Sequence, residues 1–349
     1  MVRRNLIVAA AAVLALGLAW LAGAAGAHPA PPAEAPAAGP RRPVATAAIP
    51  ATCRLGAFVT SLHGIDTARN RFSADFWLWS LCADPERRPL ETIEFFNADE
   101  ARKELGATMA RGGQQWGQVK VMGTFRHRFD LRNYPFDRHR LVITLEEAVE
   151  DASAFAYRAD VLNSGLHEGL RIEGWRIDDF RVKARETLYR SNFGDPTLPA
   201  RAAVRFTRLD IEIDLARDQM TSFLKLTVPM YAAAILALIS FLMHTESDAR
   251  LNPRIAFLGG AMLTVVLNMR GVDETVGAVE GVSMLDLLHA AVLALIVAAT
   301  ATAVWCGQLL EKGVEAAAVR RVDYAAFWTA GGLYLLANLA VVAAAMAAG

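Results

Sequence analysis

Two arginines at the ends of a short apolar segment have the clearest chemical consequence in this sequence. Arg254 and Arg270 bracket a run that contains Gly259-Gly260, Thr264 and Asn268. A lipid-facing helix this short would need both arginines to extend along it to reach water, whereas a helix lining a water-filled pore accommodates them. Helical spacing groups one stripe: Ala256, Gly260, Leu263, Leu267 and Arg270. The stripe predicts a pore helix, and the alternative is a lipid-facing helix with small residues for close packing.

This segment is the second of four apolar spans in a predicted transmembrane domain over residues 220–349. The spans run at about 222–243, 253–270, 284–306 and 324–348. Each is near the roughly 20 residues that cross a bilayer. Lys and Arg occur in the first and third connections but not in the second, from Gly271 to Ser283. The positive-inside rule therefore places both basic connections in the cytoplasm, and the C-terminus and the preceding domain outside.

The N-terminus has the pattern of an export signal over residues 1–27. Arg3 and Arg4 precede the apolar run from Leu6 to Leu21, and small residues follow. A fifth transmembrane helix is the alternative. Residues 28–50 are mostly Ala and Pro, which predicts a disordered linker. We expect a multi-pass protein of the inner (plasma) membrane, with its N-terminal domain in the periplasm or extracellular space.

The region 51–219 has mainly the period-two pattern of strands. Phe72, Ala74, Phe76 and Leu78 alternate with more polar positions in one segment. In another segment, charged residues separate a second apolar set: Leu209, Ile211, Ile213 and Leu215. Several such strands predict an all-β antiparallel sandwich, followed by an all-α membrane domain. Helix-forming composition predicts one short helix over Asp99–Ala110.

Two of the three cysteines flank an apparent hairpin. Cys53 and Cys82 are equidistant from a point between Thr67 and Ala68, inside the turn Asp66–Asn70. An antiparallel ladder centred there would place the two sulfurs opposite each other, which predicts a cross-strand disulfide. Two separate buried thiols are the alternative. Cys306, at the end of the third span, is expected to be a passive packing residue.

The segment Phe129–Leu141 contains the sharpest local motif. Pro135 between Tyr134 and Phe136 predicts a rigid turn, with a cis peptide bond as one possibility. The two aromatic side chains then form an apolar plug. An ordinary aromatic-proline turn within a β domain is the alternative reading.

Several classes of function find no support in the sequence. The 36 basic and 36 acidic residues balance, which gives no reason to expect nucleic acid. A nucleophile–base set, a glycine-rich phosphate loop and metal-ligand spacing are all missing from the sequence, so we expect no enzyme, cofactor or metal site. A membrane-tethered enzyme and a structural or assembly protein remain as weaker alternatives. Some histidines of the outer domain could sense protons between pH 5 and 8: His63, His127, His139 and His167.

Together these features resemble the pentameric ligand-gated ion channel (Cys-loop receptor) family, and its bacterial-type members in particular. Ser73–Trp79 resembles the second-strand pattern of the family, and Phe129–Asp137 resembles its signature loop. Strand Phe206–Leu215 leads through Arg217 into a span that contains Pro229. The resemblance covers nearly all of the chain from Thr52 onward. The cysteines that bracket the signature loop in animal receptors are absent here, as in bacterial members.

The resemblance implies a homopentamer in the lipid bilayer, in which four identical subunits join each copy. Each subunit would carry an immunoglobulin-like sandwich on a four-helix bundle, and the second spans would surround an axial pore for inorganic ions. A small molecule or protons would open the pore. Pro253-Arg254 resembles the pore entry of anion-selective members, with Leu263 at the hydrophobic gate, which weakly favours anions. The alternative is a non-conducting, receptor-like membrane pentamer.

The resemblance also assigns individual residues to roles. A gating-coupling cluster would contain Asp66, Asp137 and Arg217, beside the plug Tyr134, Pro135 and Phe136; ordinary surface ion pairs are the alternative. The ligand site would draw on six aromatic residues: Trp77, Phe96, Phe155, Tyr157, Tyr189 and Phe193. Such a cage suits an ammonium ligand. The alternative is that these rings belong to the core of the sandwich.

Overall fold

The computed structural model describes residues 50–199, 201–218, 220–243, 248–277 and 281–348, in two units. The β unit extends up to Phe129 and again from Arg138 to Asp218. The helical unit takes in the intervening loop Asp130–Asp137 together with the chain from Gln219 onward. The predicted export signal and nearly all of the predicted linker lie outside the described residues.

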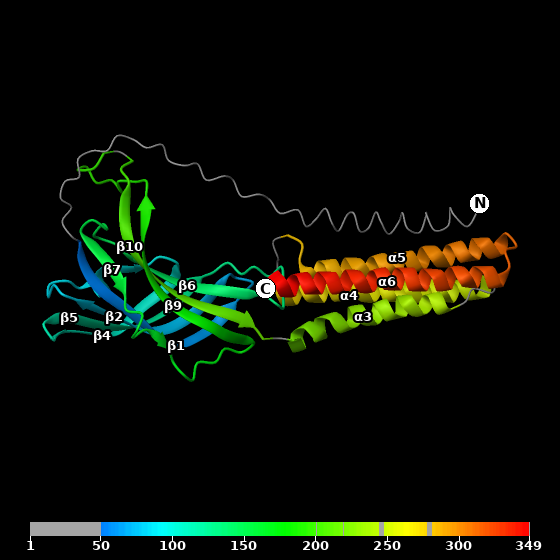
Figure 1. Ribbon diagram of the computed structural model, residues 1–349, viewed down its shortest axis with the longest axis horizontal. Coiled ribbons are helices and arrows are strands. Elements are labelled where there is room, and N and C mark those ends of the chain that lie inside the picture. The colour runs from blue at the N-terminus through cyan, green and yellow to red at the C-terminus, as the bar shows by residue number, and fades with distance from the viewer. Residues whose placement is uncertain (1–49, 200, 219, 244–247, 278–280, 349) are drawn as a thin grey trace. The chain divides into compact units, whose positions relative to one another are not determined.

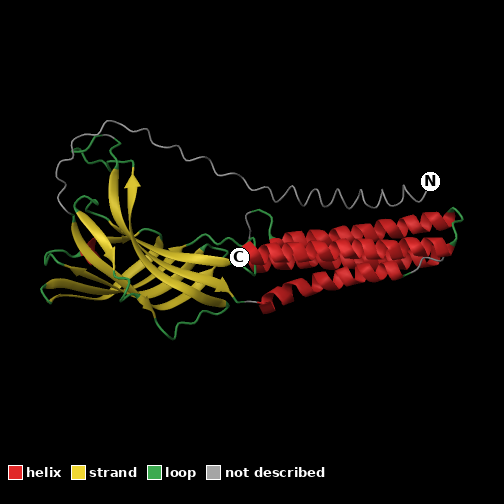
Figure 2. Cartoon of the chain, viewed as in Figure 1, coloured by secondary structure: helices red, strands yellow, loops and turns green. Residues whose placement is uncertain are grey.

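Two sheets make up the β unit, drawn as yellow arrows in Figure 2. The first has the order β4-β5-β2-β1-β7, with β8 also paired to β1, and the second has the order β3-β6-β10-β9. The strands of the first sheet are β1 (Ala51–Asp66), β2 (Arg71–Cys82), β4 (Ala98–Arg111), β5 (Gln114–Arg126), β7 (Phe155–Ala159) and β8 (Gly165–Leu166). Those of the second are β3 (Ile93–Phe95), β6 (Arg138–Glu147), β9 (Trp175–Tyr189) and β10 (Val204–Arg217). A one-turn helix, α2 (Pro89–Thr92), precedes β3.

The apolar core of the β unit lies where the two sheets face each other. The predicted apolar positions of β2 and β10 are all 0–1% exposed, so the period-two prediction is confirmed for both strands. The ring of Phe76, on β2, lies 6.2 Å from that of Phe95, on β3, and Phe125 of β5 contacts both. Since β2 and β5 belong to one sheet and β3 to the other, these rings join the sheets.

The helix predicted over Asp99–Ala110 is wrong, because this segment forms strand β4. It pairs antiparallel with β5 across a turn at Gly112 and Gly113, whose φ angles are 58° and 74°. Glycine adopts these positive φ angles without steric cost, so the turn commits the segment to a hairpin. Helix propensity differs by only about 0.7 kcal/mol per residue among ordinary residues, and pairing with β5 outweighs it.

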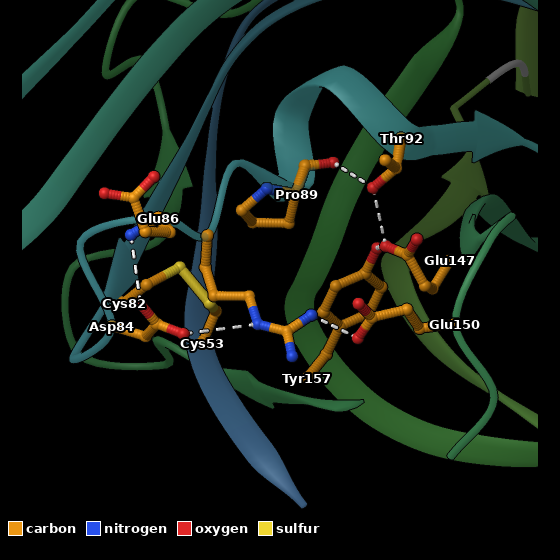
Figure 3. The surroundings of a disulfide bond; sticks show 10 residues. Cys53, Cys82, Asp84, Glu86, Pro89, Thr92, Glu147, Glu150 and Tyr157 are labelled. Carbon is orange, nitrogen blue, oxygen red and sulfur yellow. Dashed lines mark hydrogen bonds and ion pairs between the residues drawn. A yellow bond between two sulfur atoms is a disulfide. The ribbon is translucent and has the colours of Figure 1, made fainter. Parts of the chain in front are cut away.

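The disulfide between Cys53 and Cys82 is confirmed (Figure 3). The two residues are direct partners in the β1–β2 register, with their Cα atoms 4.3 Å apart. The predicted turn is also confirmed, since β1 ends at Asp66 and β2 begins at Arg71. Cys306 is free and buried. The disulfide closes the far end of the hairpin and fixes the start of the segment that leads to α2.

Four long helices, drawn in red in Figure 2, make up most of the helical unit, and each is long and apolar enough to span a membrane. They are α3 (Met220–Leu242), α4 (Asp248–Val276), α5 (Met284–Glu311) and α6 (Ala316–Ala348), labelled in Figure 1. The prediction of four spans is confirmed, and the chain is a membrane protein with a β-rich domain before four apolar helices. The helices extend beyond the apolar runs; α6, for example, begins at Ala316 rather than at Tyr324.

Candidate functional site

The signature loop (Phe129–Asp137) packs onto the membrane helices through the part that belongs to the helical unit. The ring of Phe136 lies 5.6 Å from that of Phe223 on α3. The backbone N–H of Met284, the first residue of α5, donates to the carbonyl of Arg132 at 2.8 Å. Tyr134 and Asp137 are buried, and the Tyr134–Pro135 peptide bond is cis. The loop therefore contacts the beginnings of two helices.

A cavity of about 450 Å³ lies beside the same loop. Leu131 and Tyr134 line it from the loop, the end of α4 contributes Val272 and Val276, and the start of α5 contributes Leu285. A capping box fixes the start of α5: Asp286 N–H donates to the Ser283 hydroxyl, and the Asp286 carboxylate accepts from Ser283 N–H. The loop thus lies beside the C-terminal end of α4 as well as the starts of α3 and α5.

The three charged residues predicted to couple the domains have different surroundings. Asp66 accepts a hydrogen bond from Arg69 N–H at 2.9 Å and pairs with Arg69 and Arg71 of its own hairpin. The Arg217 guanidinium lies over the Trp175 ring, 4.1 Å from its centroid. Asp137 is 2% exposed. A coupling cluster of Asp66, Asp137 and Arg217 stays a prediction.

Three of the six predicted ligand-site aromatics gather around Arg208, a residue that the sequence interpretation did not select. The Arg208 guanidinium lies 3.8 Å from the centroid of Phe96 and 5.7 Å from that of Tyr189. Phe193 packs against Tyr189 at 5.5 Å, and Phe206 packs against both rings. We call these five residues the Arg208 cluster. Since Phe96 is 45% and Phe193 63% exposed, the cluster is open at its edge.

A buried carboxylate completes the polar side of the Arg208 cluster. Glu146, 7% exposed, accepts from Arg208 Nε and from the Tyr189 hydroxyl, the latter at 2.9 Å. The Tyr189 hydroxyl also accepts from Arg208. Burial, together with the hydrogen bond and charge of Glu146, raises the pKa of Tyr189, so this phenol stays neutral at physiological pH. The cluster combines a fixed cation, a fixed anion and aromatic faces.

The other three predicted ligand-site aromatics lie elsewhere in the β unit. Phe155 and Tyr157 form a buried pair on β7, with ring centroids 5.4 Å apart, and the Tyr157 hydroxyl donates to Glu147. The Thr92 hydroxyl donates to the same carboxylate, as Figure 3 shows. Trp77 lies on β2, opposite Phe58 of β1 and Lys120 of β5. Neither Trp77 nor the β7 pair is grouped with the Arg208 cluster.

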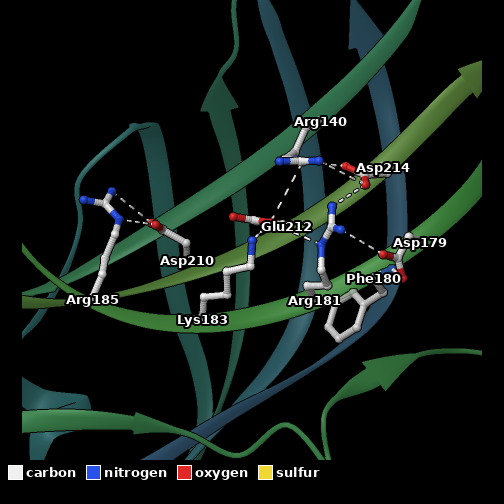
Figure 4. Close-up of polar contacts among 9 residues, drawn as sticks. All are labelled: Arg140, Asp179, Phe180, Arg181, Lys183, Arg185, Asp210, Glu212 and Asp214. Carbon is white, nitrogen blue, oxygen red and sulfur yellow. Dashed lines mark hydrogen bonds and ion pairs between the residues drawn. The ribbon is translucent and has the colours of Figure 1, made fainter.

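The charged face of β10 is paired across the sheet rather than left to solvent. Lys183 of β9 contacts Glu212 at 2.8 Å, and Arg140 of β6 contacts Asp214 at 2.7 Å (Figure 4). Arg181 contacts both carboxylates. Burial acts to raise the pKa of Asp214, but hydrogen bonds and charges of Arg140 and Arg181 outweigh it and hold the pKa below its usual value. These cross-strand pairs fix the register beside Arg208.

Two of the predicted proton-sensing histidines pack against each other at the stem of the signature loop. The rings of His127 and His139 lie 5.8 Å apart, and Phe129 contacts each of them at less than 5 Å. His139 also contacts Trp175, the ring beneath Arg217. Burial, and secondarily the charge of His139, lowers the pKa of His127 to about 4.

The predicted pore stripe lies on the exposed side of α4, with one exception. Leu263 and Leu267 are 59% and 58% exposed, and Ala256, Gly260 and Arg270 are exposed too. Arg254 is 0% exposed and pairs with Asp323 of α6 at 2.9 Å, so its predicted place among the pore-lining residues is wrong. The physical reason is helical spacing, which puts Arg254 on the packed stripe: Leu258, Ala261, Val265 and Val272.

Comparisons with known proteins add no family assignment. No protein-family model matches the chain, and no curated protein matches it.

Proposed function

We propose that this protein is a homopentameric gated ion channel of the inner (plasma) membrane, with its β unit outside the cytoplasm and α4 lining an axial pore. The observation that carries this proposal is the packing of the signature loop against the membrane helices. The loop continues directly from β5 and into β6, and its Phe136 and Arg132 contact α3 and α5. A change of state in the β unit therefore reaches the membrane helices along the chain itself.

The exposed leucines of α4 supply the gate in this proposal. Five copies each of Leu263 and Leu267 would form two apolar rings that close a pore by dewetting. Both side chains are more than half exposed in the single chain, as a pore-facing side chain must be before assembly. With Arg254 buried, the expected preference for anions rests on Arg270, on the same exposed stripe.

The Arg208 cluster is the proposed sensor site for a small molecule. Its exposed rings, Phe96 and Phe193, give access from solvent, and Glu146 supplies a buried negative charge. An ammonium ligand suits aromatic faces beside a carboxylate. Because the Arg208 guanidinium already lies over Phe96, such a ligand binds by competing with Arg208 for that face and for Glu146.

Protons are the second candidate stimulus, supported by the pair of His127 and His139. Protonation of His127 puts a charge between aromatic rings at the stem of the signature loop, which disfavours the packed arrangement. A rearranged stem in which His127 meets water would bind the proton more tightly, with a pKa closer to 6.5. Acidification from pH 7 to pH 5 therefore favours the rearranged stem.

Current recording from purified protein in planar bilayers tests the channel proposal. Steps of pH and additions of small amines should open a current, and its reversal potential in asymmetric salt identifies the permeant ion. A reversal near the chloride potential supports the role of Arg270. Intact pentamers that carry no current under any of these stimuli would contradict the channel and favour a non-conducting, receptor-like pentamer.

A further inference from the structure

All four membrane helices contribute to one buried cluster around Arg254. Its Nη1 lies 2.9 Å from Oδ1 of Asp323 on α6, and its guanidinium lies 5.9 Å from the ring centroid of Phe241 on α3. The Cys306 thiol on α5 donates to the same Asp323 oxygen at 3.6 Å. All four side chains are at most 1% exposed. A charged pair thus lies in the centre of the bundle, with one contribution from each helix.

The cluster lies at the end of the bundle where the chain connects α3 to α4 and α5 to α6. Arg254 and Asp323 are within the first eight residues of α4 and α6, and Phe241 and Cys306 are within the last six of α3 and α5. At the opposite half, Asn268 of α4 donates to the carbonyl of Leu226 on α3 and contacts His289 of α5, both at 2.9 Å. α4 therefore has polar contacts to its neighbours near both ends.

Helix geometry links these contacts to the exposed leucines. At 100° per residue, Leu263 lies about 180° and Leu267 about 220° around the helix axis from Arg254. Asn268 lies about 40° from Arg254 on the same calculation. When Arg254 and Asn268 face the bundle, both leucines must therefore face away from it.

We propose that the Arg254–Asp323 pair fixes the rotation of the N-terminal half of α4 about its axis, so that the exposed stripe faces the pore. Arg254 then has no part in ion selectivity. The guanidinium stays charged at all physiological pH values, and its buried position gives it a partner instead of contact with ions. This inference rests on the proposed role of α4 as the pore helix.

Cys306 is a native probe of the cluster, because the other two cysteines form the disulfide. We expect N-ethylmaleimide to label Cys306 slowly in the wild-type pentamer. Arg254→Met or Asp323→Leu alone should raise the labelling rate by about tenfold or more, because each leaves one charge of the buried pair uncompensated. The double variant should label slowly again. Arg320→Met, an exposed site one turn from Asp323, is the matched control and should change nothing.

A second labelling experiment separates positioning from a purely structural role. In a Cys306→Ala background, Ala256→Cys reports the accessibility of the N-terminal half of the stripe, near Arg254. Leu267→Cys reports the accessibility of the half next to Asn268. In the folded double variant Arg254→Met/Asp323→Leu, a charged thiosulfonate should modify Ala256→Cys at about one third of the original rate or slower. The reason is that the coupling between Arg254 and Asp323, which holds the stripe toward the pore, is lost. Leu267→Cys should react at its original rate. The charge-swapped variant Arg254→Asp/Asp323→Arg should recover the rate at Ala256→Cys.

Two results would overturn the proposal. One is an Ala256→Cys rate that does not change when the pair is removed, and the other is a single variant in which Cys306 stays protected. The reversal potential is a third measurement. The double variant should keep the wild-type reversal potential, because Arg254 has no part in ion selectivity. Both labelling arms work on a pentamer that carries no current, so failure of the channel proposal and failure of the positioning proposal are distinguishable.

Discussion

Two buried arginines, one in each unit, differ in whether solvent reaches the contacts that hold them. Arg208 in the β unit and Arg254 in the helical unit are 6% and 0% exposed, and each pairs with a carboxylate. Arg208 is also bound to the Tyr189 hydroxyl and stacked on Phe96, at a cluster edge that solvent reaches. Arg254 contacts Asp323 of α6 and Phe241 of α3, and Cys306 of α5 contacts the same Asp323 oxygen.

The difference concerns what can replace each partner. In the proposed sensor site, a ligand that enters at Phe96 or Phe193 would replace contacts of Arg208 with Glu146 and Phe96. The pair of Arg254 and Asp323 has no such edge, and losing one partner leaves a charge in an apolar interior. We therefore infer that Arg208 takes part in ligand sensing, whereas Arg254 positions the pore helix.

Removal of Arg254 should have the largest effect. Arg254→Met should lower the stability of the folded protein by about 3–5 kcal/mol, since the buried Asp323 carboxylate loses the compensating charge of the guanidinium. The additional change Asp323→Leu should restore most of that loss. Thermal melting of the four members of this double-mutant cycle measures the coupling, and additive losses would show that the two charges do not stabilise each other.

His127 should make the stability of the β unit depend on pH. The pKa of His127 is about 4 when folded and about 6.5 when unfolded, so the unfolded chain binds more protons between these values. The contribution of His127 to stability should thus level off above pH 6.5 and fall by up to about 3 kcal/mol as pH drops to 4. His127→Phe should flatten this profile in denaturant titrations. An unchanged slope would exclude His127 as the group responsible.

Removal of Arg208 should have a smaller effect on stability but a large one on sensing. Arg208→Met leaves Glu146 with the Tyr189 hydroxyl as a donor, so we expect a loss of about 1–3 kcal/mol, together with a changed response to amines. Arg185→Met is the control, since Arg185 forms a comparable pair with Asp210 at a more exposed position. Equal effects of both variants on the amine response would contradict the proposal that the Arg208 cluster is the sensor site.

The smallest predicted effect belongs to Tyr189→Phe. It removes one donor to Glu146 and keeps the ring that contacts Phe193 and Phe206, so it should cost about 1 kcal/mol. The amine concentration for half-maximal response should change by about fivefold, which is the same free energy. A response that disappears altogether would contradict this, because it would show that the substitution displaces the ring as well as removing the hydroxyl.

The fold was predictable where local pattern and tertiary environment agree. Alternation at Phe72–Leu78 and at Leu209–Leu215 identified buried strand faces, and cysteine spacing around Asp66–Asn70 identified the disulfide. Segment Asp99–Ala110 was mispredicted because its composition favours helix, while the pairing of β4 with β5 depends on a turn beyond it. The sequence contained the necessary signal in the adjacent glycines, Gly112 and Gly113.

Charged residues of the candidate site were harder to predict. Arg208 and Glu146 lie on strands whose charges alternate with apolar residues, a pattern that predicts a solvated face. Their burial depends on the rings of Phe96 and Tyr189, which come from distant segments. Arg254 was assigned to the pore from its position at the helix end. Its spacing to Leu258, Ala261 and Val265 places it on the packed side, and that spacing was readable beforehand.

The proposal that the exposed stripe of α4 lines a conducting pore can be tested by thiol block of the current. In a Cys306→Ala background, Leu267→Cys and Val265→Cys place a thiol on the exposed and on the packed side of one helix turn. A water-soluble thiosulfonate should block the stimulated current of Leu267→Cys and leave that of Val265→Cys unchanged. A current that neither residue affects, or one blocked only through Val265→Cys, would contradict the assignment of α4 as the pore helix.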